Sequence, residues 1–94
     1  MTEKCWKISG RVQGVGFRYW VLRKAAKIGG LSGYAMNHPS GDVLVKAIGD
    51  EDKLNQLFIV LHRGPLFSRV DSVEENPALN TLFPPVHEGI FQRI

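Results

Sequence analysis

The sequence has few of the features that mark disulfide-linked, membrane-spanning or metal-binding proteins. Its single cysteine, Cys5, can form no disulfide within the chain, which fits a reducing compartment, and we expect the cytoplasm. No segment is apolar over the length that a bilayer or a signal peptide requires, so we expect no membrane partner. The three histidines, at positions 38, 62 and 87, are too scattered to predict a metal site.

Charge and length leave several classes of function open. A net charge of +3 is mild, and it favours anionic small molecules as readily as nucleic acid. The chain of 94 residues contains no repeat and no low-complexity tract, which predicts a single domain, residues 1–94. A chain of this size buries roughly 60–65% of its unfolded surface and folds without disulfides, so the function has to be sought in local motifs.

The hydrophobic pattern predicts the order β-α-β-β-α-β, with a short fifth strand. Alternation over residues 5–12 predicts a half-buried strand, and helical spacing from Phe17 to Ile28 predicts a helix that ends at Gly29. We expect a second helix between Asp50, its N-cap, and Gly64, a hairpin turn at 37–42, and further strands at 31–36, 43–48, 66–73 and 90–93. This order favours an α+β sandwich of the ferredoxin-like type, with an antiparallel sheet and both helices on one face.

The predicted topology brings two distant segments together. Right-handed crossovers make the first two strands parallel, with the third strand between them. The first two strands therefore end at the same edge of the sheet. We expect the segment 14–18 and Asn37 to be neighbours there, although nineteen positions separate Arg18 from Asn37.

The run from Gly10 to Arg18 (GRVQGVGFR) predicts an anion-binding loop between the first strand and the first helix. Gly14 and Gly16 accept the dihedral angles with which successive N–H groups point at one anion, and the helix start adds further unpaired N–H groups. Arg18 adds a planar guanidinium that suits a phosphoryl group. A cation at a helix start opposes the dipole by about 0.3–1 kcal/mol, which disfavours a purely structural role for Arg18. The glycines alone would also fit an ordinary tight turn.

Other reactive side chains have simpler structural explanations. Cys5 lies well before the loop, too far from Arg18 for a phosphocysteine phosphatase. The acidic residues 50–52 have the look of an aspartyl-phosphate nucleophile pair, but they suit a helix start at the opposite edge of the sheet. Arg63 is the expected cation at the end of the second helix, and His38 is at most a residue that tunes substrate entry.

Two motifs in this chain resemble those of the acylphosphatase family. The first is the run Ile8 to Arg18, and the second comprises Gly33 to Asn37 with Gly41, Asp42, Val43 and Gly49 after it. Together they lie within residues 8–49, a span of nearly half of the sequence. The resemblance implies an enzyme that hydrolyses the carboxyl–phosphate bond of small acylphosphates to a carboxylate and inorganic phosphate. It implies no cofactor and no metal.

The resemblance also implies roles for particular residues. Arg18 would bind the phosphoryl group together with the backbone amides of the loop, which comprises Gly14, Val15, Gly16, Phe17 and Arg18. Asn37 would orient the attacking water; without the motif, a turn residue would be the simpler interpretation of it. Inorganic phosphate or sulfate would compete with the substrate, and we expect a monomer.

Two alternatives belong to other classes of function. Single-stranded RNA binders share the same element order, but they stack bases on aromatic residues of the central strands. The predicted third strand has no aromatic residue and the first offers only Trp6, so we expect no nucleic-acid partner. A non-catalytic acylphosphatase-like module that binds a phosphorylated ligand or partner is the second alternative, and the presence of both Arg18 and Asn37 argues against it.

Overall fold

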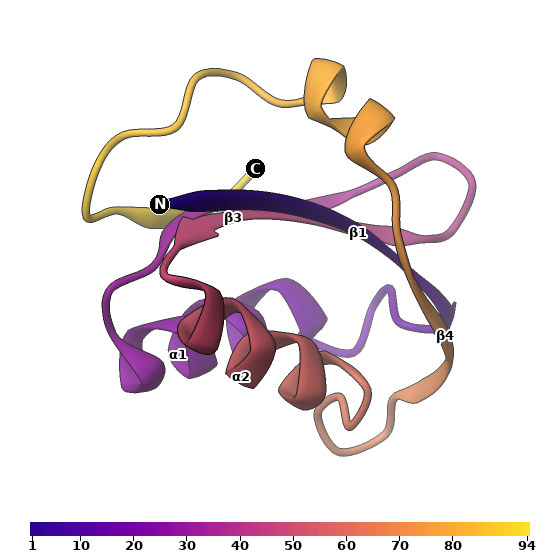
Figure 1. The fold of residues 1–94 in the computed structure, drawn as a ribbon. Helices are drawn as coiled ribbons and strands as arrows, with labels where there is room; N and C mark the ends of the chain where they lie inside the picture. Colours follow the sequence, from indigo (N-terminus) through magenta and orange to yellow (C-terminus); the bar gives the residue numbers. More distant parts are fainter.

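The computed structural model describes residues 1–94, which form a sheet with two helices packed against one face (Figure 1). The strands are β1 (Thr2–Arg11), β2 (Ser32–Asn37), β3 (Val43–Gly49), β4 (Arg69–Glu75) and β5 (Phe91–Arg93). The helices are α1 (Phe17–Ile28), α2 (Glu51–Leu61) and the 3-10 helix η1 (Pro77–Leu82). No helix is long and apolar enough to cross a membrane.

The strand order is β4-β1-β3-β2-β5, and the ferredoxin-like fold is confirmed. β3 pairs antiparallel with both β1 and β2, so β1 and β2 run in the same direction on either side of it, as predicted. The expectation of a wholly antiparallel sheet is wrong at one edge, because β5 pairs parallel to β2. After β4 the chain crosses the second face of the sheet to the opposite edge and enters it alongside β2 (Figure 1).

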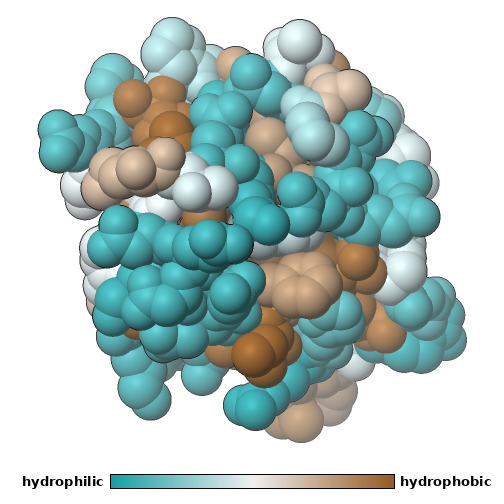
Figure 2. All heavy atoms as spheres, viewed as in Figure 1, coloured by the Kyte–Doolittle hydropathy of each residue, from teal (hydrophilic) through white to brown (hydrophobic).

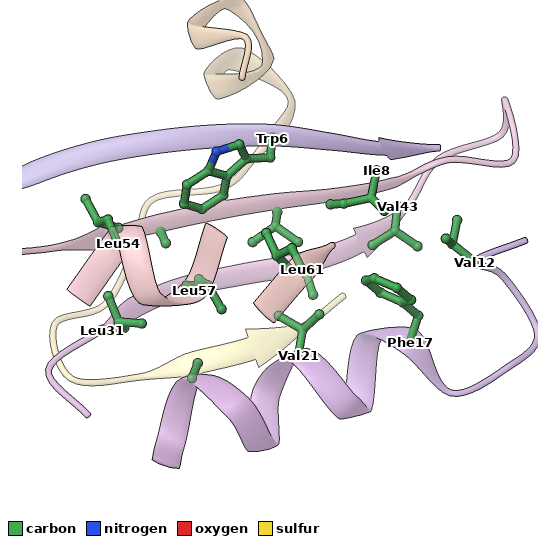
Figure 3. Close-up of a cluster of buried hydrophobic side chains, with 14 residues drawn as sticks. Trp6, Ile8, Val12, Phe17, Val21, Leu31, Val43, Leu54, Leu57 and Leu61 are labelled. Atoms are coloured by element: carbon green, nitrogen blue, oxygen red, sulfur yellow. The ribbon is translucent and has the colours of Figure 1, made fainter. Parts of the chain in front are cut away.

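The main core lies between the sheet and the two helices (Figure 3). Trp6 and Ile8 point into it from β1, Val21 from α1, and Leu57 and Leu61 from α2, all of them buried. Each such side chain stabilises the fold by about 1.5–3 kcal/mol relative to an exposed one. The predicted helical faces are confirmed, because the residues spaced by three and four positions are the buried ones.

A second, smaller core covers the other face of the sheet. It comprises Cys5, Tyr34, Leu44 and Phe83. The expectation that the first strand is half-buried is therefore wrong at Cys5 and Trp6, which are both buried, one on each face. The cover is the segment around η1, and the Tyr34 hydroxyl donates to the carbonyl of Pro85 at 2.8 Å.

The loop between α2 and β4 differs from its prediction. Strand β4 begins at Arg69 rather than at Leu66, and Leu66 and Phe67 are 81% and 78% exposed. The backbone turns there, since Phe67 has a φ of 72° and the N–H of Ser68 donates to the carbonyl of Pro65. Figure 2 shows hydrophobic side chains at the surface below the sheet, over α2 and the loop that follows it.

The start of α2 agrees with its prediction in position. Asp50 precedes α2 as predicted, but its side chain makes no capping hydrogen bond.

Gly10 allows β4 to approach β1 closely just before the loop between β1 and α1. The register of the two strands shifts between Ser9 and Gly10, where the φ of Gly10 is 128°. A Cβ atom at Gly10 would collide with the backbone carbonyl of Arg69. At Gly89, by contrast, φ is 77° and a Cβ would meet no atom within 4 Å.

We therefore predict that Gly10→Ala lowers the free energy of unfolding by about 2–4 kcal/mol, because it adds a steric clash to an unfavourable φ. Gly89→Ala, the control that tests the φ alone, should cost about 1–2 kcal/mol. Urea denaturation of both variants measures the difference. Equal losses in the two variants would contradict the account of the β1–β4 contact.

Candidate active site

A hollow of about 100 Å³ opens at the edge of the sheet where β1 and β2 end. Its lining residues come from the β1–α1 loop, the first turn of α1 and the ends of β2 and β5. They are Val12, Gly14, Gly16, Phe17, Arg18, Tyr19, Asn37 and Arg93. The predicted proximity of the segment 14–18 to Asn37 is confirmed, because both contribute to the wall of this one hollow.

The β1–α1 loop presents a row of free backbone donors. Gly14 and Gly16 have φ angles of 74° and 77°, the left-handed region that glycine adopts without strain. The N–H groups of residues 15–18 donate to no acceptor within the protein. Val15 differs from the others in that its side chain packs against the main core, so only its backbone is available to the site. The loop thus has the donors of an anion-binding concavity.

Helix α1 adds to the positive character of the loop. Its N-cap is Gly16, and its first turn contains no acidic residue. Phe17 is buried in the main core, as predicted, and this fixes the start of the helix. The N-terminal end of the helix dipole therefore faces the hollow without a neutralising carboxylate.

Arg18 is half-buried and is held from one side. Its Nη1 donates to the carbonyl oxygen of Ile94 at 2.9 Å. The N–H of Ile94 in turn donates to the carbonyl of Ala35 in β2 at 2.9 Å. One guanidinium nitrogen is thus engaged by the end of the chain, and the other N–H donors of Arg18 remain available to a ligand.

Asn37 is the last residue of β2 and is half-buried. Its backbone pairs with Val43 in β3, which fixes the direction of its side chain. The Asn37 side chain makes no hydrogen bond to the protein. The hairpin turn begins one residue later, where the N–H of His38 donates to the carbonyl of Asp42. The side chain therefore has both a donor and an acceptor to offer in the hollow.

Three lining residues, Val12, Tyr19 and Arg93, are not among the predicted site residues, and of these Val12 is buried in the main core. The guanidinium of Arg93 lies 5.7 Å from the centre of the Tyr19 ring, and that of Arg23 lies 5.9 Å from it. Arg93 reaches the hollow because β5 lies beside β2. That pairing joins residues far apart in the sequence, and no local sequence pattern around Arg93 predicts it. For Tyr19, the only indications of a place in the site are that it directly follows Arg18 and that it is exposed on α1.

The other candidate residues lie away from the hollow. Cys5 lies in the core on the second face of the sheet, and burial raises the pKa of its thiol. The acidic residues 50–52 begin α2 or precede it directly. His38 bonds to the Ser40 hydroxyl through Nδ1 at 2.8 Å within the hairpin turn, and Arg63 lies with Lys24 in a groove between α1 and α2. No group of three or more His, Cys, Asp or Glu side chains could hold a metal ion.

Comparison with known proteins agrees with this arrangement. The acylphosphatase family model matches residues 5–82. An acylphosphatase of Nitratidesulfovibrio vulgaris is 40% identical over 89 residues, which is 95% of this chain and 82% of that protein. An acylphosphatase of Deinococcus radiodurans is 52% identical over 67 residues, which is 71% of this chain and 76% of that protein.

A solved structure extends the similarity to the whole fold. The crystal structure of acylphosphatase from Bacillus subtilis has a TM-score of 0.81 and 33% sequence identity, and the match covers 100% of this chain and 99% of that one. The sequence and structural matches together span nearly every element, including the two motifs that form the hollow. The chain belongs to the acylphosphatase family.

Proposed function

We propose that this protein hydrolyses the carboxyl–phosphate bond of small acylphosphates. Water adds to phosphorus, the bond between phosphorus and the acyl oxygen breaks, and a carboxylate and inorganic phosphate leave. The observation that carries the proposal is the composition of the hollow, where free N–H groups, Arg18 and Asn37 meet and no carboxylate intervenes. Membership of the acylphosphatase family supports it independently.

The first task of the site is to bind the phosphoryl group. The N–H groups of residues 15–18 and the free donors of Arg18 match three phosphoryl oxygens, and the helix end favours their negative charge. These donors are fixed before the substrate arrives, because Val12 and Phe17 are buried on either side of the loop. Preorganised donors of this kind stabilise the charge that develops in the transition state of phosphoryl transfer.

The second task is to place the water. Asn37 can accept a hydrogen bond from a water molecule and donate one to a phosphoryl oxygen, so it can hold the water in line with the leaving carboxylate. An amide cannot take up a proton. We therefore assign the proton of the water to a phosphoryl oxygen of the substrate. The carboxylate leaves as a stable anion and needs no general acid.

The same chemistry defines the partners. Inorganic phosphate and sulfate match the donors of the loop and would compete with the substrate. RNA stacking on β1 is disfavoured, because Trp6 is 1% exposed and packs against Phe58. We propose a monomer that acts on a small-molecule acylphosphate in the cytoplasm, without a nucleic-acid or membrane partner.

Arg18→Ala should abolish turnover and weaken inhibition by inorganic phosphate, because it removes the guanidinium that binds the phosphoryl oxygens. The measurement is phosphate release from benzoyl phosphate, with the inhibition constant for phosphate determined in the same assay. Arg11→Ala, which removes an exposed arginine outside the hollow, is the control and should behave as wild type. An unchanged inhibition constant in Arg18→Ala would remove Arg18 from the binding site.

Asn37→Ala should lower kcat by roughly 10²–10³-fold and leave the inhibition constant for phosphate nearly unchanged, because only the placement of water is lost. Asn55→Ala, at an exposed position on α2, serves as the control. If Asn37→Ala retained the kcat of wild type, the assigned role of Asn37 would be wrong. A folded wild type that binds phosphate but releases none from acylphosphates would instead support the non-catalytic module.

Cys5→Ala should retain kcat within about twofold, because the thiol is buried away from the hollow and its raised pKa keeps it protonated at neutral pH. Loss of turnover in folded Cys5→Ala protein would favour a thiol nucleophile.

The profile of kcat against pH should show no titrating base near neutrality, since no histidine or carboxylate lines the hollow. A step in the pH profile that disappears when one histidine is replaced would favour a general base.

A further inference from the structure

Gln13 makes the only hydrogen bonds between the segment that follows β1 and the hairpin that follows β2. It lies two residues after the end of β1 and one residue before Gly14, and its side chain is partly buried. The Nε2 group of Gln13 donates to the carbonyl of His38 at 2.7 Å and to that of Asp42 at 2.9 Å. Both N–H donors of its amide are thereby used.

The two carbonyls that Gln13 binds are the ones that close the hairpin turn. The N–H of His38 donates to the Asp42 carbonyl at 2.9 Å, and the N–H of Gly41 donates to the His38 carbonyl at 3.0 Å. Each carbonyl therefore accepts two hydrogen bonds, one from the turn and one from Gln13. Since His38 directly follows Asn37, the Gln13 amide fixes the backbone next to the asparagine.

The sheet joins the two halves of the site only indirectly, through β3. β1 and β2 are separated by β3 in the sheet, so no ladder hydrogen bond connects β1 directly with β2. β1 leads into the β1–α1 loop, which in our proposal is the phosphate loop, and β2 ends at Asn37. Relative movement of these two strand ends would change the distance between the bound phosphoryl group and the water. A misplacement of about 1 Å at a reacting centre can cost about 10²-fold in rate.

We propose that Gln13 is a positioning residue that sets the place of Asn37 relative to the phosphate loop. The inference rests on the proposed function, and it assigns to Gln13 an effect on water attack rather than on phosphate binding. The side chain suits this task because it offers two uncharged N–H donors at the end of a flexible stem. A glutamate at this position would instead direct carboxylate oxygens at two carbonyl oxygens.

The test is a double-mutant cycle of Gln13 and Asn37. We expect Gln13→Ala to lower kcat for benzoyl phosphate by roughly 10–100-fold, with the inhibition constant for inorganic phosphate within about twofold of wild type. In the Asn37→Ala background, the additional Gln13→Ala change should lower kcat by less than about twofold, since the residue through which Gln13 acts is already gone. Gln13→Met keeps the length of the side chain but has no N–H donor, and it should lower kcat as much as Gln13→Ala does. If Gln13→Ala unfolds, Gln13→Met takes its place in the cycle with Asn37→Ala. Gln56→Ala, on the exposed face of α2, is the matched control and should retain full activity.

The outcomes separate this inference from the function on which it rests. A folded wild type that releases no phosphate would overturn both. An active wild type with an impaired Asn37→Ala variant would support the proposed function. In that case full activity of Gln13→Ala or Gln13→Met, or equal losses from the Gln13 change in both backgrounds, would overturn the positioning role alone. A large rise in the phosphate inhibition constant would do the same, because it would show that Gln13 supports the loop instead.

Discussion

The left-handed backbone of the β1–α1 loop is the constraint on which the rest of the site depends. Free N–H groups face one hollow only if the chain turns at Gly14 and Gly16, where φ is positive. The turn is held in place by burial at both ends, through Val12 before it and Phe17 after it. The core and the site are therefore not independent, since the side chains that stabilise the fold also fix the free N–H donors of the loop.

The remaining parts of the site are brought to this loop by the sheet. Asn37 lies beside the loop because β1 and β2 end at the same edge of the sheet, and Arg93 lies there because β5 pairs parallel to β2. The hydrogen bond from Arg18 to the Ile94 carbonyl ties the loop side of the site to the end of the chain. In our proposal, the hydrogen bonds of Gln13 connect the loop to the hairpin turn that follows Asn37. Catalysis would then depend on the spacing of strand ends more than on any reactive side chain.

The sequence predicted the parts of this structure that are local or depend on strong topological rules. Glycine spacing predicted the loop, helical periodicity predicted α1 and α2, and the handedness of crossovers predicted that Asn37 lies near the loop. The parallel pairing of β5, and with it the position of Arg93, was not predictable because it depends on contacts between residues about sixty positions apart. The cover over Cys5 depends on contacts of the same long-range kind, and the apolar character of Leu66 favours a strand although the residue is exposed in a loop. The roles of Arg18 and Asn37 rest on the family resemblance and stay predictions.

The most direct test of the central claim, that water attacks phosphorus in a site built from fixed donors, is hydrolysis of an acylphosphate in water enriched in ¹⁸O. Mass spectrometry of the products from single turnovers of benzoyl phosphate locates the label. Attack at phosphorus predicts that one ¹⁸O atom enters inorganic phosphate and that the benzoate stays unlabelled. Label in the benzoate would contradict the account, because it would place the attack at the carbonyl carbon and leave the phosphate loop and Asn37 without their proposed tasks.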